Sequence, residues 1–267
     1  MQLLLPRDRA RRSQRRHAGH QAERQTFPYL PAQRKHGHSA SSPRSALRAS
    51  KGAIPIPRNR SALPPADERL IRGLHTRKRR AENHLFLVEG VRIAEEALDA
   101  DLVLRFAVVS SSLEDNERGA ALDRRLRAAT AVFEAGDAAM KRLAATETSQ
   151  GVLLVAETPV AALEDLVLPA RTVALVLDGV QDPGNFGTLV RSADAFAAAA
   201  VIALPGTVDP WNPKAVRAAA GSLFRVPVAR LELPAASAWL RQRGFMLLAA
   251  DPAGEALDDV PIPERAA

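Results

Sequence analysis

The stretch TVALVLDGVQDPGNFGTLVRSADAF, residues 172–196, contains three successive structural signals. Thr172 to Leu177 is almost uniformly apolar, as expected of a parallel strand whose two faces are both covered by helices. Asp178 to Asn185 then combines Gly, Pro, Asp and Asn, which are typical of turns. The pattern predicts a loop at the carboxyl end of a strand, where open α/β sheets bind their ligands.

A helix is expected to follow this loop. Asn185 is a good N-cap residue, and an apolar stripe at helical spacing forms the expected core face: Phe186, Leu189, Val190, Ala193 and Ala197. Gly187, Arg191 and Asp194 cluster on a flank from which a side chain can reach the preceding loop. An arginine on a flank is more often simply solvated, but Gly187, one turn earlier, permits the close approach of a backbone. We therefore interpret this flank as a candidate site.

Upstream of residue 158 the pattern also alternates between strand and helix. Short apolar runs at 85–88, 102–109, 131–133 and 151–156 predict strands, and segments 89–98, 113–129 and 137–143 predict helices. This alternation predicts an α/β domain with a mostly parallel sheet at residues 65–157. The segment 158–170 contains two prolines and is expected to be a linker, and a second α/β domain is expected at 171–267.

A basic run lies near the start of the first domain. A helix opening at Ala66-Asp67-Glu68 is expected to run through Leu74 and to end in Arg77-Lys78-Arg79-Arg80. Cations suit the negative end of a helix dipole, and the same side chains can bind a phosphate backbone. A solvated charge run is the commoner case, and both interpretations stay open.

The formal net charge of +7 is unevenly distributed. Residues 1–64 contain 14 Lys and Arg but only Asp8 and Glu23 as acidic residues, whereas the rest of the chain is acidic overall. We expect residues 1–64 to be a disordered basic leader, because they lack a sustained apolar period. Three interpretations remain open: upstream sequence translated from a misassigned start, a nucleic-acid-binding arm, or an organellar transit peptide.

Composition excludes several classes of protein. The chain of 267 residues has no cysteine, which excludes disulfide scaffolds and cysteine-based metal sites, and no metal is expected. The longest strictly apolar run, Ala195 to Leu204, covers ten residues, well below the roughly 20 that span a bilayer. We therefore expect no membrane association and a location in the reducing cytoplasm.

Residues 178–196 resemble the first signature motif of the SpoU (TrmH-type) branch of the SPOUT RNA methyltransferases. A second stretch, NPKAVRAAAGSLFRVP at 212–227, is similar to the second motif of that family. Residues 65–157 are similar to the ribosomal-protein-like substrate-binding domain that precedes the catalytic domain in members acting on 23S rRNA. Together the resemblance covers residues 70–267, about three quarters of the chain.

The resemblance implies methyl transfer from S-adenosylmethionine to a ribose 2'-hydroxyl of RNA, with 23S rRNA as the expected substrate. In the family, the residues matched by Asn185, Gly187 and Arg191 line the reaction site, and the arginine is proposed to act on the 2'-hydroxyl. A guanidinium group is a poor proton acceptor, so Arg191 is better interpreted as a clamp on the adjacent phosphate or as a stabiliser of the developing alkoxide. Asn185 is expected to hold the loop or to donate to a ribose oxygen.

The two motifs and the basic run supply further candidates. Lys214 and Arg217 are three residues apart on one helical face and are candidate RNA phosphate contacts, although a solvated basic face fits equally well. In the substrate-binding domain the corresponding candidates are Arg77, Lys78 and Arg79. Gly187 and Gly221 are expected to be structural glycines of the two motifs.

The third motif of the family is absent from this sequence. Members carry a strand, a Gly-rich loop and a helix start that form a deep trefoil knot and bind S-adenosylmethionine. A strand expected at 245–250 and its following loop are present, and the sequence then stops at Ala267. The resemblance therefore implies an incomplete SPOUT domain in a C-terminally truncated member, with only Ala249 and Ala250 remaining of the cofactor-binding residues.

Family members pair through their knotted domains, so the resemblance implies a homodimer whose interface, like the stability of the sheet, is expected to be compromised by the truncation. Two functions remain open: an RNA 2'-O-methyltransferase and a non-catalytic RNA-binding remnant of the same family. A nucleotide-dependent dehydrogenase would also alternate strands and helices, but the loop after Leu177 lacks the G-x-G-x-x-G fingerprint.

Overall fold

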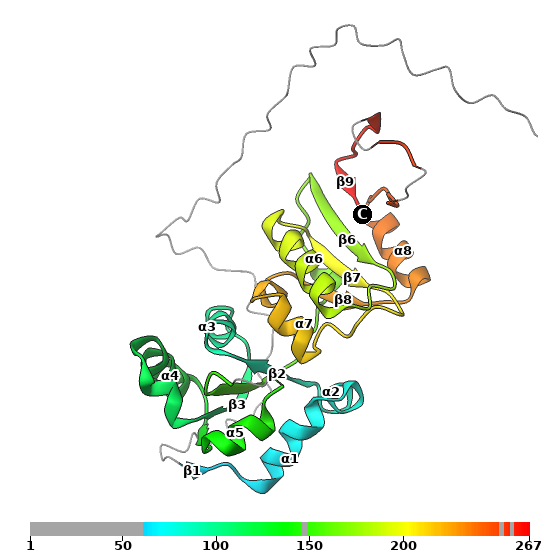
Figure 1. Ribbon diagram of the computed structural model, residues 1–267. Coiled ribbons are helices and arrows are strands. Elements are labelled where there is room, and N and C mark those ends of the chain that lie inside the picture. Colours follow the sequence, from blue (N-terminus) through cyan, green and yellow to red (C-terminus); the bar gives the residue numbers. More distant parts are fainter. Residues whose placement is uncertain (1–60, 146–148, 251–253, 257–258) are drawn as a thin grey trace, which may run out of the picture. The chain divides into compact units, whose positions relative to one another are not determined.

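The computed structural model describes residues 61–145, 149–250, 254–256 and 259–267 (Figure 1). Apart from residues 61–64, the segment predicted to be a basic leader lies outside the described residues. The described chain forms two sheets flanked by helices, one in the N-terminal domain (61–157) and one in the C-terminal domain (171–267). The predicted α/β fold class is confirmed.

The N-terminal sheet has five strands in the order β1-β4-β3-β5-β2. They are β1 (Ser61–Ala62), β2 (Leu85–Glu89), β3 (Leu104–Val109), β4 (Val132–Glu134) and β5 (Val152–Glu157). β4 pairs in parallel with β1 and β3, whereas β5 pairs antiparallel with β2 and β3. The prediction of a mostly parallel sheet is therefore wrong for this domain, because an apolar run does not encode strand direction. β1 also extends the sheet into the segment predicted to be leader.

Helices cover both faces of this sheet. They are α1 (Pro65–Leu74), α2 (Arg77–Asn83), α3 (Val91–Asp99), α4 (Glu117–Ala129) and α5 (Asp137–Leu143). Leu85 and Leu87 of β2 pack in one cluster with residues of α1 and α5. Phe86 and Val88 alternate with these leucines and pack in another cluster with residues of α3 and α4. The period of two residues thus places β2 between two apolar layers.

The basic run lies in a helix of its own. α1 ends at Leu74, and α2 begins at Arg77 after Thr76, whose hydroxyl accepts a hydrogen bond from the backbone nitrogen of Arg79 at 3.4 Å. The prediction of one helix from Ala66 to Arg80 is wrong, because Thr76 is a good N-cap and starts a new helix. The basic residues therefore occupy the start of α2 rather than the negative end of α1.

The C-terminal sheet is parallel and has four strands in the order β8-β7-β6-β9. Its strands are β6 (Thr172–Leu177), β7 (Ala200–Ala203), β8 (Val228–Arg230) and β9 (Arg265–Ala266), and its helices are α6 (Pro183–Ala195), α7 (Pro213–Ala218) and α8 (Leu233–Gln242). Residues of α6 and α7 pack in one core cluster, and residues of α8 pack with Ala174, Ala200 and Ile202 in another. The sheet is thereby covered on both faces.

The strand predicted at 245–250 is reduced to a single bridge between Met246 and Ala266. The backbone nitrogen of Met246 donates to the carbonyl of Arg265 at 2.9 Å, and that of Leu248 donates to the carbonyl of Ala267 at 2.7 Å. An apolar run forms a strand only where a neighbour supplies hydrogen-bond partners, and β9 is two residues long. Met246, Leu247 and Leu248 consequently remain exposed.

One apolar cluster contains side chains from both sheets. It includes Phe86 and Val88 from β2, Leu177 from β6, and Val190 and Val216 from α6 and α7. α7 packs directly against β2.

Within the described ranges no helix is long and apolar enough to cross a membrane.

Candidate functional site

The loop between β6 and α6 contains the first motif. Asp182 is the N-cap of α6, and its Oδ1 accepts a hydrogen bond from the backbone nitrogen of Asn185 at 2.7 Å. Pro183 occupies the first turn, where its missing N–H has no intrahelical partner to lose. The prediction of Asn185 as N-cap is therefore wrong: α6 begins earlier, and the side chain of Asn185 is exposed.

Asn185, Thr188 and Arg191 lie at intervals of three residues and are all exposed. Nη2 of Arg191 donates to Oγ1 of Thr188 at 3.2 Å. Because a helix rises about 1.5 Å per residue, Asn185 and Arg191 are separated by about 9 Å along the axis of α6. In the part of the chain that the structure describes, no carboxylate pairs with Arg191, so its charge is available to an anion.

The opposite face of α6 is buried. It consists of Phe186, Gly187, Val190 and Ala193. Leu189 is half-buried, whereas Ala197, which was predicted to belong to the apolar stripe, lies beyond the helix end with φ 52° and is exposed. A Cβ at Gly187 would lie 2.4 Å from Cβ of Ala218. The backbone that approaches Gly187 closely is therefore that of α7.

The second motif forms α7 and the residues on either side of it. Oδ1 of Asn212 accepts a hydrogen bond from the backbone nitrogen of Lys214 at 2.9 Å and caps the helix. The side chain of Lys214 is exposed, and Arg217 is half-buried with an Nη1 that has no hydrogen-bond partner among the described residues. The ammonium group of Lys214 is therefore open to an RNA phosphate, whereas Nη1 of Arg217 is enclosed by protein atoms and does not face solvent.

Gly221 follows α7 in a left-handed conformation, with φ 91°. A Cβ at this position would lie 2.7 Å from the side chain of Glu96 in α3. Both the backbone conformation and the available space therefore require glycine at this turn of the second motif.

Two loops meet at the carboxyl ends of β6 and β7. Oγ1 of Thr207 donates to the carbonyl of Leu177 at 2.8 Å, and the backbone nitrogen of Val208 donates to the carbonyl of Val180 at 2.9 Å. These bonds hold the loop before α7 against the loop before α6. The two motifs are thus neighbours at the sheet edge where a ligand site was predicted.

Two family models match this chain: the SpoU rRNA Methylase family at residues 172–267 and the MRM3-like substrate binding domain at residues 69–154. An uncharacterised tRNA/rRNA methyltransferase of Mycobacterium tuberculosis is 32% identical over 200 residues, which cover 72% of this chain and 68% of that protein. This chain belongs to the SpoU rRNA methylase family.

Solved structures and other SpoU relatives agree with this assignment. The 23S rRNA (guanosine(2553)-2'-O)-methyltransferase RlmP of Bacillus subtilis is 37% identical over 161 residues, 60% of each chain. The SpoU methyltransferase AviRb from Streptomyces viridochromogenes, solved in complex with the cofactor AdoMet, has a TM-score of 0.68 and 26% identity over 76% of this chain and 80% of its own. A structure of an RNA 2'-O ribose methyltransferase has a TM-score of 0.63 and 31% identity over 76% of this chain and 77% of its own.

The SpoU chain described here spans about 60% of the length of the curated relatives it matches first. The fraction is 60% for the Bacillus subtilis protein and 56% for a 23S rRNA (uridine(2479)-2'-O)-methyltransferase of Streptomyces viridochromogenes.

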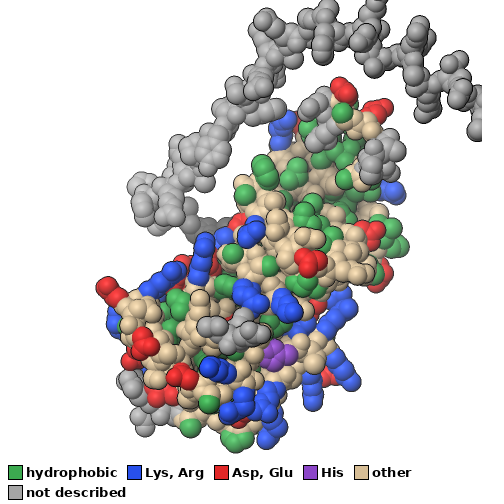
Figure 2. Space-filling model, viewed as in Figure 1, with side chains coloured by type: hydrophobic (Ala, Val, Ile, Leu, Met, Phe, Trp, Pro, Cys, Tyr) green, Lys and Arg blue, Asp and Glu red, His purple; other side chains and the backbone are tan. Residues whose placement is uncertain are grey.

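α2 carries the candidate RNA contacts of the N-terminal domain of this SpoU family member. Arg77, Lys78 and Arg79 are exposed, and Figure 2 shows Lys and Arg side chains gathered over α1 and α2. Arg79 and Lys78 lie 3.3 and 3.9 Å from the carboxylate of Glu82. Arg77 has no carboxylate partner within the described ranges, so it is the most available cation of the three.

Arg80, the next residue, is buried with 4% of its surface exposed. Its Nε and Nη2 donate to Oδ2 of Asp209 at 2.9 and 2.6 Å, and its Nη1 donates to the carbonyl of Leu74 at 2.8 Å. Asp209 belongs to the loop before α7, so Arg80 links α2 to the second motif. The basic run in the sequence gave no sign that Arg80 differs from its exposed neighbours. The direction of the Arg80 side chain depends on where α2 begins, and the start of this helix was predicted wrongly.

Arg225 is the second residue that sequence patterns did not single out. Its guanidinium donates to Oδ2 of Asp194 in α6 at 2.9 and 2.7 Å and to Oε2 of Glu96 in α3 at 2.5 Å. The hydrogen bond with Asp194 raises the pKa of Arg225, burial opposes this effect, and the bond with Glu96 adds to it. The sequence signal that could have predicted this ion pair was Asp194 on the flank of α6 together with Arg225 in the second motif.

Ala249 and Ala250, the candidate cofactor-binding residues, are exposed and lie outside any helix or strand. Neither makes a hydrogen bond to another backbone group among the described residues. The same ranges contain no group of three or more His, Asp or Glu residues that could hold a metal ion.

Proposed function

We propose that this chain transfers a methyl group from S-adenosylmethionine to a ribose 2'-hydroxyl of RNA, with 23S rRNA as the substrate. Family membership supports this proposal, and so does the similarity to 23S rRNA 2'-O-methyltransferases of Bacillus subtilis and Streptomyces viridochromogenes. The observation that carries it is the exposed guanidinium of Arg191, which lies on the helix of the first motif and has no carboxylate partner in the described part of the chain.

When bound, S-adenosylmethionine would supply an electrophilic methyl carbon for the ribose 2'-oxygen, with the electron pair of the carbon–sulfur bond staying on sulfur and the hydroxyl proton passing to solvent. Arg191 keeps its positive charge throughout and stabilises the negative charge that develops on the 2'-oxygen or the adjacent phosphate. Thr188 orients that guanidinium through the 3.2 Å hydrogen bond, and the amide of Asn185 donates to a ribose oxygen.

Ala249 and Ala250 fit one part of a cofactor site. Both residues are exposed, and their backbone groups have no backbone hydrogen-bond partner among the described residues. Backbone N–H and C=O groups are among the polar contacts by which proteins orient a cofactor.

Methyl transfer from radiolabelled S-adenosylmethionine to ribosomal RNA tests the proposal. Arg191→Ala is expected to lower kcat by about 10² to 10³, because the lost charge acts in the transition state, and Arg191→Lys is expected to recover part of the rate. Arg241→Ala, at an exposed arginine of α8, is the matched control and is expected to retain full activity. Full activity of Arg191→Ala would overturn the site assignment.

The alternative function is RNA binding without catalysis. The observation that favours it is the exposure of the segment with Ala249 and Ala250, which no other described element covers. Retained RNA binding together with no detectable methyl transfer by the unsubstituted chain would support this alternative.

A homodimer and a cytoplasmic location belong to the same proposal. Exposed apolar side chains around β9 and after α8 support pairing with a second copy: Val173, Met246, Leu247, Leu248 and Ile262. Light scattering at two protein concentrations tests the dimer.

The absence of cysteine suits a reducing compartment, and cell fractionation tests the location.

A further inference from the structure

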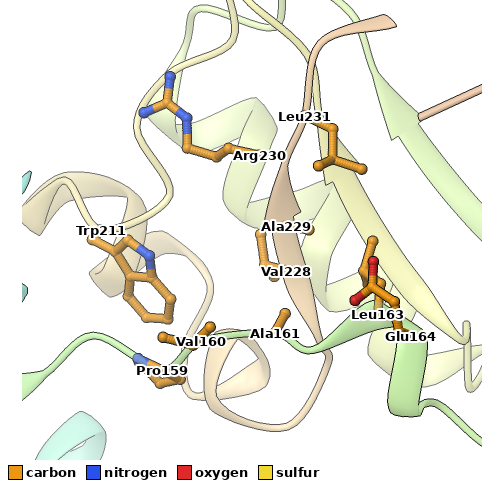
Figure 3. Close-up of a pocket in the computed structure, with 10 residues that line it drawn as sticks. All are labelled: Pro159, Val160, Ala161, Leu163, Glu164, Trp211, Val228, Ala229, Arg230 and Leu231. Carbon is orange, nitrogen blue, oxygen red and sulfur yellow. The ribbon is translucent and has the colours of Figure 1, made fainter. Parts of the chain in front are cut away.

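A pocket with a volume of about 330 Å³ lies between the linker and the outer edge of β8 (Figure 3). Pro159, Val160 and Ala161 of the linker line one side of it, and Val228 and Ala229 line the other. β8 pairs with β7 on one side only, so its outer edge faces this pocket.

Trp211 gives the pocket an aromatic wall. Its ring packs on Phe86 with a centroid distance of 4.6 Å, and it lies beside Pro159 and Val160 in the pocket (Figure 3). Its indole N–H donates to no acceptor among the described residues and is available to a ligand. Aromatic side chains of this kind are the surfaces on which proteins stack unpaired nucleobases.

Cations outnumber anions at one end of the pocket. Nη1 of Arg230 lies 3.8 Å from Oδ1 of Asp209, which is too long for a hydrogen bond, and Asp209 is already bonded by Arg80. Burial lowers the pKa of Arg230 and the positive charge of Arg77 lowers it further, while Asp209 opposes both. Arg80 and Arg230 thus share the carboxylate of Asp209, and the charge of Arg77 adds to the positive potential at Arg230, which leaves an excess of positive charge for an anion.

We propose that this pocket binds one unpaired nucleotide of the substrate RNA, with its base against Trp211 and its phosphate held by Arg230. Glu164 lines the pocket as well and supplies an acceptor for the amino group of a base. The excess of positive charge favours a polyanion over a protein strand at the β8 edge. The inference rests on the proposed RNA substrate and adds a contact outside the two motif helices.

Fluorescence of Trp211 reports occupancy of the pocket. The chain has two tryptophans, so a Trp239→Phe background leaves Trp211 as the sole indole. A mixed-sequence single-stranded RNA of about ten nucleotides is expected to quench this signal. A double-stranded RNA of the same length is expected to quench it much less, because its bases are already stacked.

Substitutions separate the phosphate contact from the base contact. Arg230→Ala is expected to weaken single-stranded RNA binding about fivefold and to reduce the slope of log K against log salt by about 1, whereas Arg230→Lys keeps the slope. Trp211→Leu is expected to weaken binding about fivefold to a hundredfold with little change in slope, and Trp211→Phe to retain most of the affinity. Arg241→Ala is the matched control for loss of one exposed charge.

The outcomes distinguish this inference from the proposed function. Unchanged RNA affinity in both Arg230→Ala and Trp211→Leu overturns the nucleotide pocket even if methyl transfer is observed, and leaves the β8 edge to a partner's strand. Both losses together with no methyl transfer support the pocket and overturn the catalytic proposal. Loss of binding in Trp211→Phe as well as Trp211→Leu, accompanied by a lower melting temperature, overturns a stacking role. Absence of any RNA binding by the unsubstituted chain overturns both proposals.

Discussion

β2 and β6 are both short apolar strands, but they are buried to different extents. β2 lies at the edge of its sheet, yet all of its residues are buried. β6 lies between two strands, yet only Ala174 and Leu177 of it are buried. The reason is that α1, α3 and α7 pack around β2, whereas β9 pairs only with the first two residues of β6. An apolar run indicates a tendency to be buried, and its neighbours determine whether it is.

Among the substitutions that test this comparison, Phe86→Ala is expected to lower the free energy of unfolding most. Its ring is fully buried in β2 and lies 4.6 Å from Trp211 and 6.1 Å from Phe224 between ring centroids. Phe86→Ala is expected to lower the free energy of unfolding by about 4 kcal/mol, because it leaves a cavity in the shared core. Urea denaturation followed by circular dichroism measures the loss.

Two valines give the matched control for the same comparison. Val88 in β2 is fully buried and Val176 in β6 is half-buried. Val88→Ala is expected to cost about 2 kcal/mol and Val176→Ala less than about 1 kcal/mol. Equal losses would contradict the difference between the two strands.

Arg80→Ala is expected to cost about 3 kcal/mol, because it leaves the carboxylate of Asp209, only 10% exposed, without its hydrogen-bonded partner. Arg79→Ala, one residue away and exposed, is expected to change stability by less than about 0.5 kcal/mol. The pair Arg80→Met and Asp209→Leu is expected to recover part of the loss. Similar denaturation midpoints for Arg79→Ala and Arg80→Ala would show that this ion pair does not anchor α2 to the loop before α7.

Gly187→Ala tests α7, which packs against both β2 and α6. A Cβ would lie 2.4 Å from Cβ of Ala218, so one helix must move, at an expected cost of about 2 kcal/mol. Gly136→Ala is the control, since a Cβ there meets no atom within 4 Å. A melting temperature for Gly187→Ala as high as that of the control would contradict the tight contact.

The smallest effect is expected from Glu95 of α3, whose carboxylate accepts hydrogen bonds from Arg118 of α4. The hydrogen bond with Arg118 lowers the pKa of Glu95 below 4.5, and burial opposes it. Because the folded-state pKa is the lower one, the stabilisation is present above the ordinary pKa of glutamate and is lost as the pH falls through the lowered value.

Melting temperatures of the unsubstituted chain and Arg118→Ala measure this pH dependence. They are expected to differ at neutral pH and to converge in acid, below the lowered pKa of Glu95. A difference that stays constant across this range would contradict the assignment to Glu95.

Much of the fold could be predicted from the sequence, because several segments have a single strong period. The strand at 85–88, the helix at 137–143 and the strand at 172–177 all lie where the pattern predicted them. Element ends were less predictable, since Thr76 and Asp182 compete with nearby residues as caps. Strand direction in β5 depends on the path of the chain rather than on its apolar residues.

For the candidate site, the sequence could predict the types of the residues and the side of the helix on which they lie, but not their long-range partners. The exposed position of Arg191 on the flank of its helix followed from helical phase, whereas Asn185 was expected to cap this helix and Gly187, expected on the same flank, is buried. The burial of Arg80 and the double ion pair of Arg225 did not, because each depends on carboxylates far away in the sequence, Asp209 and Glu96. Long-range partners of this kind have no local sequence signal.

The apolar cluster that joins Phe86 and Val88 to Val190 and Val216 has a consequence for cooperativity. The two family models divide the chain between residues 154 and 172, but the cluster extends across that division. Separating the chain there would expose apolar surface on both halves. The two family regions are therefore not two separate folding units. Residues 61–267 should unfold in one transition rather than two.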